Sequence, residues 1–417
     1  ALPKVLHKLS GRSMLGHVVA VVESLGEAKK IIVTGHGAEQ VEQQFKSPTT
    51  IFTQQKEQLG TGHAVHMAVP ELCSDALVIV LYGDVPLIRP VTIQKILAVV
   101  TESTMGLLTI NLDQPNGYGR IVRNTKGEIT GIIEQKDASA EQLKITEVNT
   151  GVLALQSSQL RDWLPKITNN NAQGEYYLTD LVAIAREAGV EIVSVNPESA
   201  TEVEGVNNRV QLSQLERAHQ RQLAEVLMES GTSLADPARF DQRGDLSAGT
   251  DNFIDINCVF NGSVTIGSNV SIGANCQISD STIGDGVSIL PNTIIESSVV
   301  GDRAVVGPFA RLRPGTRMES DTKVGNFVET KKTLVGKGSK INHLSYVGDA
   351  QLGENVNIGA GTITCNYDGV SKHKTDLGDG VFVGSNSTLV APIKVDKGGF
   401  IAAGSTVTTE VPSDSLA

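Results

Sequence analysis

The chain of 417 residues has few cysteines, little basic charge and no long apolar run, and each shortage excludes a class of protein. The four cysteines, Cys73, Cys258, Cys276 and Cys365, are widely scattered and show no paired metal-ligand spacing. This arrangement argues against a disulfide framework or a metal cluster. It favours reduced thiols, used as small packing residues, in a protein of the cytosol.

Charge and hydropathy exclude further classes. Lysine and arginine number 35 against 46 aspartates and glutamates, and no basic tract offsets the net charge of −11. Nucleic-acid and membrane-surface binding are therefore not expected, and an anionic small substrate would have to meet local cations. No stretch is apolar over the roughly 18 residues of a membrane span, and no secretory signal is visible in a sequence that begins at Ala1.

What the sequence does contain is a six-residue repeat. From about Ile254 to the C-terminus, an aliphatic residue followed by a small one returns every six positions, with occasional five-residue steps. Helical positions recur near 3.6 residues, so this period suits short flat strands with one inward aliphatic side chain each. The repeat predicts a parallel β-helix. Representative pairs are Ile266-Gly267, Ile272-Gly273, Ile283-Gly284, Val306-Gly307, Val324-Gly325 and Val347-Gly348.

Such a repeat is equally compatible with a passive spacer, because repeat architectures stack for stability whatever they do. A polar, turn-forming segment at 364–375 interrupts the repeat. A long excursion from a rigid coil usually serves a site. The interruption therefore favours a functional surface.

The first half of the chain has a different pattern of apolar residues. Apolar runs at 28–34, 76–81, 106–111 and 191–195 alternate with helix-like stretches at 16–25 and 61–69. The alternation predicts a doubly wound α/β sheet.

A single helix is expected to join the two halves. Residues 208–230 contain no Pro or Gly and are rich in good helix formers, which predicts a rigid arm about 34 Å long. The predicted organisation is an α/β domain at 1–207, a linker helix at 208–230 and a β-helix domain at 231–417.

The segment of the α/β half that most strongly indicates a functional site is 76–87, where a predicted buried strand ends at Asp84. An acid there lies at the carboxyl edge of the sheet, where open α/β folds bind ligands. Taken alone, Asp84 would be a turn or cap residue. Glycine-rich turns at 60–62 and 117–119 strengthen the functional interpretation, because they let backbone amides approach a ligand. Asp84 and Asn207 offer oxygen ligands suited to Mg²⁺.

Nine segments jointly carry a family resemblance over nearly the whole chain. They are Leu2–His7, Glu57–His63, Leu81–Asp84, Gly117–Arg120, Asn169–Tyr177, Glu204–Asn208, Arg311–Gly315, Gly325–Glu329 and Gly359–Gly369. With them the chain resembles the bacterial bifunctional N-acetylglucosamine-1-phosphate uridyltransferase and glucosamine-1-phosphate N-acetyltransferase (GlmU family). The resemblance implies a Rossmann-like nucleotidyltransferase domain, a connecting helix, a left-handed parallel β-helix and a homotrimer.

The resemblance also implies two reactions that make UDP-N-acetylglucosamine for peptidoglycan and lipopolysaccharide precursors. In the β-helix half, an acetyl group passes from acetyl-CoA to glucosamine-1-phosphate. In the α/β half, the resulting N-acetylglucosamine-1-phosphate attacks UTP and releases pyrophosphate, with Mg²⁺ held by Asp84 and Asn207.

Matches to the family assign the uridyl site residue by residue. Lys4 matches a lysine that neutralises phosphate charge, while Gln55, Gly60 and Thr61 match uracil contacts, and Gly119, Glu134, Asn149 and Asn207 match contacts to the sugar phosphate. Because the sugar phosphate is already an anionic nucleophile, the protein has to align it and offset the accumulating charge. Taken singly, Lys4 could be a solvated residue and Glu134 a surface strand charge.

The chain departs from the family pattern at both ends. The family has a strand and a Gly-x-Gly-Thr-Arg-Met loop before Pro-Lys-Val, whereas Pro3-Lys4-Val5 stands almost at the first residue here. The loop would hold the nucleotide phosphates and the strand would be central in the sheet, so uridyl transfer is expected only when both are present. A basic coenzyme contact lies beyond Ala417 in the family, and weaker donor affinity is expected without it.

Acetyl transfer needs a base, because the acceptor amine is protonated near neutral pH. His343 matches the family's base, and imidazole suits this task, although a lone His in a coil is usually structural. Glu329 would hold the amine or orient His343. The other matches are Arg313, Lys331, Tyr346, Asn357 and Lys372 for the acceptor, and Ala360, Asn366, Tyr367, Ser385 and Ala403 for acetyl-CoA.

Two other interpretations stay open at this stage. A single-activity sugar-1-phosphate nucleotidyltransferase, with a β-helix for oligomerisation or regulation, would need neither His343 nor the Asn366-Tyr367 motif. A scaffold that binds sugar phosphate without chemistry would not need Asp84 or Asn207 either. Release of coenzyme A and of pyrophosphate would separate these possibilities.

Overall fold

The computed structural model describes residues 2–417, which fold as two compact units that divide between Leu215 and Glu216. The division falls within helix α7 (Arg209–Glu229). None of the described helices is long and apolar enough to cross a membrane.

Unit 1, up to Leu215, is an α/β unit. Its helices are α1 (Met14–Ser24), α2 (Ala38–Phe45), α3 (Thr61–Ala68), α4 (Pro90–Ala98), α5 (Ser157–Trp163) and α6 (Leu181–Glu187). Its strands are β1 (Lys8–Leu9), β2 (Arg12–Ser13), β3 (Lys30–Thr34), β4 (Thr50–Gln54), β5 (Leu77–Val80), β6 (Thr104–Asn111), β7 (Arg120–Arg123), β8 (Ile129–Ile133), β9 (Glu147–Gln156) and β10 (Glu191–Val195). Every strand and helix predicted for this half is present, with its ends shifted by at most two residues.

The main sheet of unit 1 is mixed, so the doubly wound prediction is only partly correct. Its order is β10-β6-β9-β7-β8, with β5 also paired to β9. Strands β10 and β6 are parallel, whereas β9 runs antiparallel to β5, β6 and β7. Strand β9 was missed in the sequence because its apolar run is continuous and lacks a helical or alternating period.

Helices cover both faces of this sheet. Leu153 and Leu155 of β9 pack with α5 and α6, while Val152 and Ala154 pack with α4. Successive side chains of a strand point to opposite faces, so one strand supplies two apolar layers. Burial on both sides fixes β9 firmly and thereby positions the loops at its ends.

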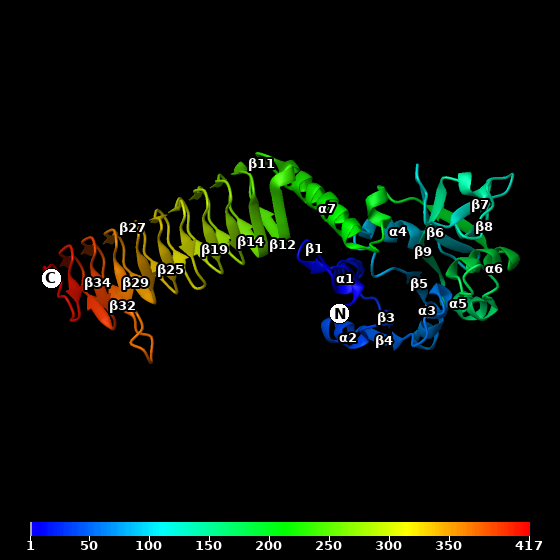
Figure 1. Ribbon diagram of the computed structural model, residues 1–417, viewed down its shortest axis with the longest axis horizontal. Helices are drawn as coiled ribbons and strands as arrows, with labels where there is room; N and C mark the ends of the chain where they lie inside the picture. Colours follow the sequence, from blue (N-terminus) through cyan, green and yellow to red (C-terminus); the bar gives the residue numbers. More distant parts are fainter. Residues whose placement is uncertain (1) are drawn as a thin grey trace. The chain divides into compact units, whose positions relative to one another are not determined.

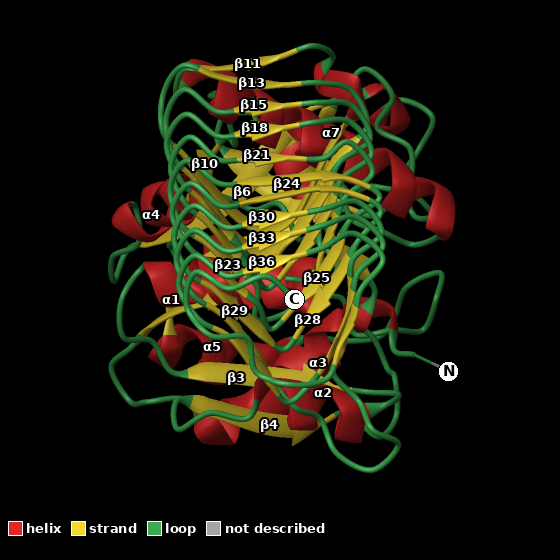
Figure 2. Ribbon diagram, turned by 90° about the vertical axis from the view of Figure 1, so that its left-hand side faces the viewer, coloured by secondary structure: helices red, strands yellow, loops and turns green. Residues whose placement is uncertain are grey.

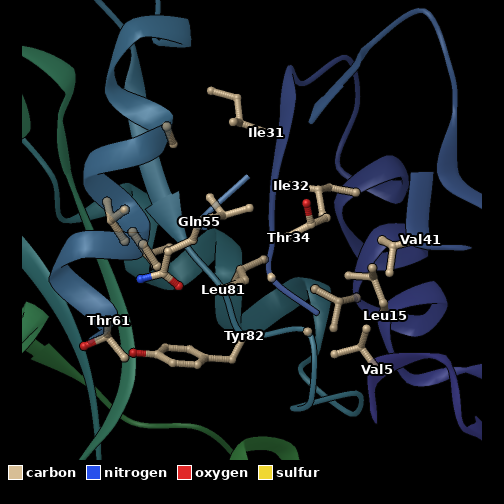
Figure 3. Close-up of a pocket in the computed structure, with 18 of the residues that line it drawn as sticks. Val5, Leu15, Ile31, Ile32, Thr34, Val41, Gln55, Thr61, Leu81 and Tyr82 are labelled. Carbon is tan, nitrogen blue, oxygen red and sulfur yellow. The ribbon is translucent and has the colours of Figure 1, made fainter. Parts of the chain in front are cut away.

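An apolar gap separates two parts of unit 1. Strands β3 and β4 form a parallel pair of their own, and β5 pairs with β9 alone among the described strands. A cavity of about 690 Å³ lies between β3 and β5, lined by Ile32, Val33, Val78 and Val80 among others (Figure 3). The cavity therefore lies between the β3–β4 pair and the sheet that contains β5.

Unit 2, from Glu216 onward, is a parallel β-helix, as the six-residue repeat predicted. One side is a ten-stranded sheet of β11 (Thr232–Leu234), β13 (Asn252–Ile254), β15 (Ser271–Ile272), β18 (Ser288–Ile289), β21 (Val305–Val306), β24 (Lys323–Asn326), β27 (Lys340–His343), β30 (Asn357–Ile358), β33 (Phe382–Val383) and β36 (Phe400–Ile401). Figure 2 shows these strands one below another.

Two further sides of the coil belong to a seventeen-stranded sheet. Its strands are β12 (Phe240–Ala248), β14 (Cys258–Ile266), β16 (Gln277–Ser279), β17 (Thr282–Ile283), β19 (Ile294–Glu296), β20 (Val299–Val300), β22 (Arg311–Leu312), β23 (Arg317–Met318), β25 (Glu329–Lys331), β26 (Leu334–Val335), β28 (Tyr346–Gly348), β29 (Ala350–Leu352), β31 (Ile363–Cys365), β32 (Thr375–Leu377), β34 (Thr388–Val390), β35 (Ile393–Val395) and β37 (Thr406–Val407).

The aliphatic member of each repeat fills the interior of the coil. Val306, Val324, Ile341 and Ile358 occupy one register position of successive coils and are buried. Each coil therefore packs on its neighbours through columns of such side chains, which give unit 2 a continuous core. The coil is rigid enough for its surface residues to keep a fixed spacing.

Two corners of the coil matter for function. The first corner follows each strand of the ten-stranded sheet and includes Phe327 and Leu344; the second corner follows β25 or β28 and includes Lys332 and Asp349. Residues 366–374 extend from the second corner as an inserted loop between β31 and β32, visible beside β32 in Figure 1.

Candidate active sites

In unit 1, the side chains of three residues that are distant in sequence form one charged cluster. The Lys4 ammonium donates to Asp84 Oδ2 at 2.5 Å and to Asn207 Oδ1 at 3.1 Å. The backbone N–H of Val206 donates to the Asp84 carbonyl at 3.0 Å, which ties the two segments together. The structure thus brings Lys4, Asp84 and Asn207 together.

This arrangement suits a cation. Two oxygen ligands already converge on one positive group, the ammonium, so they are oriented to share a metal ion as well. No group of three or more His, Cys, Asp and Glu side chains able to hold a metal occurs among residues 2–417. Two protein oxygens fit Mg²⁺, which keeps several waters and usually takes further oxygens from substrate phosphates.

The turn at the start of α3 is the second part of this site. Gln55 Nε2 donates to the Gly60 carbonyl at 3.0 Å and lies 3.1 Å from His63 Nδ1. Gly60 has a φ of 109°, and a Cβ there would lie 2.7 Å from the Tyr176 carbonyl oxygen, so only glycine fits. Thr61 Oγ1 accepts from the Leu178 N–H at 3.1 Å. The turn is therefore held in one conformation.

Tyr82 connects this turn with the charged cluster of Lys4, Asp84 and Asn207. It was not identified as a site residue from the sequence. Its hydroxyl hydrogen-bonds with Thr61 (Figure 3), and its ring lies so close to Gly151 that a Cβ there would be 2.6 Å from a ring carbon. Burial raises the pKa of Tyr82 to about 12, and the carboxylates of Glu134 and Asp84 add to the effect. Its place between Leu81 and Gly83-Asp84 in a matched motif was the signal that could have revealed it.

The third part of the site is a cluster of Gly119, Glu134 and Asn149. The Asn149 N–H donates to the Gly119 carbonyl at 2.9 Å, and a Cβ on Gly119 would lie 3.2 Å from Glu134 Oε1. Burial raises the pKa of Glu134, and the nearby carboxylates of Asp137 and Asp180 act in the same direction. Thr179 Oγ1 donates to Glu134 Oε1 at 3.2 Å and opposes that rise.

The cavity between β3 and β5 is a different kind of space. Its walls are mainly aliphatic side chains, and the predicted polar residues that line it include Lys4, Gln55 and Thr61. An anionic sugar phosphate would lose its hydration in such an interior without compensation. The polar residues around Asp84, not the cavity interior, are therefore the candidate site.

In unit 2, predicted cations gather at the second corner. Arg313 donates to Glu329 Oε1 at 2.7 Å. The ammonium of Lys372 lowers the pKa of Lys331, Arg313 adds a smaller lowering, and Asp349 opposes it. The cations of Arg313, Lys331 and Lys372 thus lie near one another, and the carboxylates of Glu329 and Asp349 do not neutralise all three. Such a cluster can bind a phosphate.

The inserted loop is a closed turn anchored at the same corner. Asn366 Nδ2 donates to Asp349 Oδ2 at 2.5 Å. Asp368 accepts from the N–H groups of Val370 and Ser371 and contacts His373 Nε2 at 2.7 Å. These bonds hold the pKa of Asp368 far below its usual range, with the Ser371 N–H as the largest cause. The tip of the loop stays exposed, Tyr367 at 59% and Val370 at 89%.

His343 lies at the first corner, at the end of β27. Its Nδ1 is 2.5 Å from Oδ1 of Asn326, the residue that pairs with it on β24. Glu329 Oε1 accepts from Arg313 at 2.7 Å, and its predicted role, to hold the amine or to orient His343, stays a prediction. Asn326, inside the matched Gly325–Glu329 segment, is the residue that sequence reasoning overlooked.

The predicted coenzyme contacts fall into two groups. Ala360, Ser385 and Ala403 follow β30, β33 and β36 and stack along the first corner, where the Asn386 N–H donates to the Ala360 carbonyl and the Gly404 N–H to the Ser385 carbonyl. Asn366 and Tyr367 lie instead in the inserted loop at the second corner.

The acceptor contacts also span more than one side of the coil. Tyr346 lies on β28, between the two corners, whereas Asn357 lies on β30 of the ten-stranded sheet. Strands β25 and β28, which run between the corners, are three residues long, or roughly 10 Å at 3.3 Å per residue. One protomer therefore presents the predicted acetyl-transfer residues at two separate corners.

Comparison with known proteins identifies matching family models and similar proteins. A family model described as MobA-like NTP transferase domain matches residues 1–119, and one described as GMPPB C-terminal domain matches residues 244–317. The whole chain is similar to curated proteins named bifunctional protein GlmU and covers 92% of each. Identity is 57% with that of Marinobacter nauticus, 53% with that of Cellvibrio japonicus and 52% with that of Burkholderia vietnamiensis.

Proposed function

The chain belongs to the family of bifunctional GlmU proteins, and on that premise we propose that it makes UDP-N-acetylglucosamine in two steps at two sites. The observation that carries the proposal is the presence of an independent charged site in each unit: Lys4, Asp84 and Asn207 in unit 1, and His343 with a cation cluster in unit 2. Family membership also supports a left-handed coil. The four free cysteines favour a reducing compartment, the cytoplasm, although Cys73 is exposed and does not serve as a packing residue.

In unit 1 the proposed reaction is uridyl transfer. Gln55, Gly60 and Thr61 bind the uracil, and Gly119, Glu134 and Asn149 hold N-acetylglucosamine-1-phosphate. A phosphate oxygen of the sugar phosphate attacks the α-phosphorus of UTP, the bond to the β-phosphate breaks, and pyrophosphate leaves. The protein contributes alignment and charge compensation, which lower the barrier without a covalent intermediate.

Lys4 supplies positive charge to the phosphates in this reaction. Mg²⁺, held by Asp84 and Asn207, would neutralise further phosphate charge when bound.

In unit 2 the proposed reaction is acetyl transfer. Arg313, Lys331 and Lys372 hold the phosphate of glucosamine-1-phosphate, with Tyr346 and Asn357 as further contacts. His343 Nε2 takes a proton from the ammonium group, the free amine attacks the thioester carbonyl of acetyl-CoA, and the carbon–sulfur bond breaks. The departing thiolate then recovers the proton from the imidazolium, and the newly acylated nitrogen releases its remaining surplus proton to the solvent, which leaves the neutral amide.

A homotrimer is proposed because one protomer does not bring the donor contacts together. Ala360, Ser385 and Ala403 line the first corner, while Tyr367 stands at the second. Phe309 and Phe327 stack at 5.4 Å along the first corner and are 52% and 55% exposed. In a closed trimer the inserted loop of one protomer can pack on this apolar corner of the next and complete each site.

The experiment that tests the proposal measures coenzyme A and pyrophosphate in one preparation supplied with glucosamine-1-phosphate, acetyl-CoA, UTP and Mg²⁺. Release of both products is expected. Pyrophosphate without coenzyme A, with N-acetylglucosamine-1-phosphate supplied, would instead support a single-activity nucleotidyltransferase. Neither product would support a binding scaffold.

A further inference from the structure

Asn326 and His343 form a side-chain pair across neighbouring coils of the β-helix. They end β24 and β27, and the parallel register places them side by side. His343 Nδ1 lies 2.5 Å from Asn326 Oδ1, and the Leu344 N–H donates to the Asn326 carbonyl at 3.1 Å. Side chain and backbone of one residue therefore fix both the ring and the turn that carries it.

The chemistry of the amide decides where the imidazole proton sits. A carbonyl oxygen only accepts, so the ring nitrogen that faces Asn326 Oδ1 must carry the hydrogen. In a neutral imidazole the other nitrogen, Nε2, then has the free lone pair. Asn326 thus leaves Nε2 as the proton acceptor and restrains the rotation of the ring.

We infer that Asn326 is a positioning residue for acetyl transfer, which holds the His343 imidazole in the tautomer that accepts a proton at Nε2. The inference rests on the proposed role of His343 as the base. Orientation of a catalytic histidine through its second nitrogen is a general requirement, because the wrong tautomer presents a donor where an acceptor is needed.

A neutral partner has a further consequence. The charged side chains on the strands next to the pair are Lys323 on β24, Lys340 on β27, and Glu329 and Lys331 on β25, and the Glu329 carboxylate bonds to Arg313. No carboxylate therefore faces Nδ1 among the described contacts of His343. An amide orients the ring but, being neutral, adds no negative charge that would favour the imidazolium.

Three variants and one control test this inference. Asn326→Ala removes the acceptor, Asn326→Asp replaces the amide with a carboxylate, and His343→Ala removes the base. Asn261→Ala is the matched control, because Asn261 makes a coil-to-coil bond to Ser279 on early coils of the same β-helix. Each variant is assayed for coenzyme A release across pH, with KM for both substrates and a thermal melt.

Asn326→Ala is expected to lower kcat by roughly 10- to 100-fold, the usual effect of losing an orienting partner, with little change in KM. Asn326→Asp is expected to recover kcat at alkaline pH and to move the acid limb of the profile upward by about one unit or more. Asn261→Ala should retain wild-type kcat and pH profile.

Two results would overturn the inference. One is an acid limb that does not move in Asn326→Asp, because the aspartate would then not contact the base. The other is a ¹⁵N spectrum of the histidine rings that shows the neutral His343 proton on Nε2, a measurement on the unmodified protein that needs no variant to fold. A His343→Ala variant with full acetyl transfer would instead refute the proposed function, and the spectrum separates these two failures.

Discussion

The Lys4 ammonium lies 2.5 Å from Asp84 Oδ2, and the side chain of that aspartate is 22% exposed. The carboxylate is thus poised to bind a cation at the surface of unit 1 and is accessible to the solvent. Because Asn207 Oδ1 contacts the same ammonium at 3.1 Å, a bound metal would share both oxygens with Lys4 or displace it.

The first prediction concerns the charge of Asp84. Asp84→Asn keeps the shape of the side chain but removes its charge, so Mg²⁺ affinity should fall by at least about tenfold, since carboxylates are the preferred ligands. Calorimetric titration with Mg²⁺ measures the change. Asp162→Ala, an exposed carboxylate on α5, is the control and should bind Mg²⁺ like the wild type. Unchanged affinity in Asp84→Asn would refute the metal site.

The second prediction separates the two roles of Lys4. Lys4→Met removes a competing cation, so Mg²⁺ should bind more tightly, yet kcat of uridyl transfer should drop by roughly 10²-fold because a positive charge near the phosphates is lost. Lys8→Met, an exposed lysine of β1, is the matched control. The account fails if Lys4→Met binds Mg²⁺ more weakly or turns over normally.

The third prediction follows from the buried phenol of Tyr82. Its pKa is raised to about 12 from 10.0, so the folded state keeps its proton over a range in which the unfolded chain loses it. This stabilisation is fully present below about pH 10 and is lost as the pH rises towards 12, by about 2 to 3 kcal/mol in total. Urea unfolding across this range should show a shallower loss in Tyr82→Phe. Equal slopes in both proteins would contradict the assignment.

The fourth prediction tests assembly. His343→Ala lacks a residue of the first corner, and Tyr367→Ala lacks one of the inserted loop, so each alone should lose most of its coenzyme A release. If the two corners meet between protomers, co-expressed variants should form some sites with both residues intact and recover roughly one quarter of wild-type activity. No recovery in the mixed protein would place each site within a single protomer. Sedimentation equilibrium checks that the mixture is trimeric.

Particular elements show how far the sequence could predict the fold. The β-helix was predictable because its inward residues, such as Val324 and Ile341, repeat at a fixed distance. Strand β9 was not, because burial on both faces removes the alternation that marks a strand. The mixed sheet follows from β9, and pairing direction leaves no local signal in the sequence.

The candidate sites were predictable only where a motif carried them. Asp84, Asn207 and Lys4 were named from motifs, and the structure brings them together. The Asn326–His343 pair depends on the register between coils, which a single repeat unit does not reveal. Separation of the acetyl-transfer residues between two corners likewise depends on where the insertion leaves the coil.

The central claim is that one chain carries two independent chemical sites. Pyrophosphate and coenzyme A release should be measured side by side for Asp84→Ala and His343→Ala. The account predicts that Asp84→Ala loses pyrophosphate release alone, and that His343→Ala loses coenzyme A release alone, by roughly 10²- to 10⁴-fold. A variant that loses both activities while still folded, or acetyl transfer within a few-fold of wild type in His343→Ala, would contradict it.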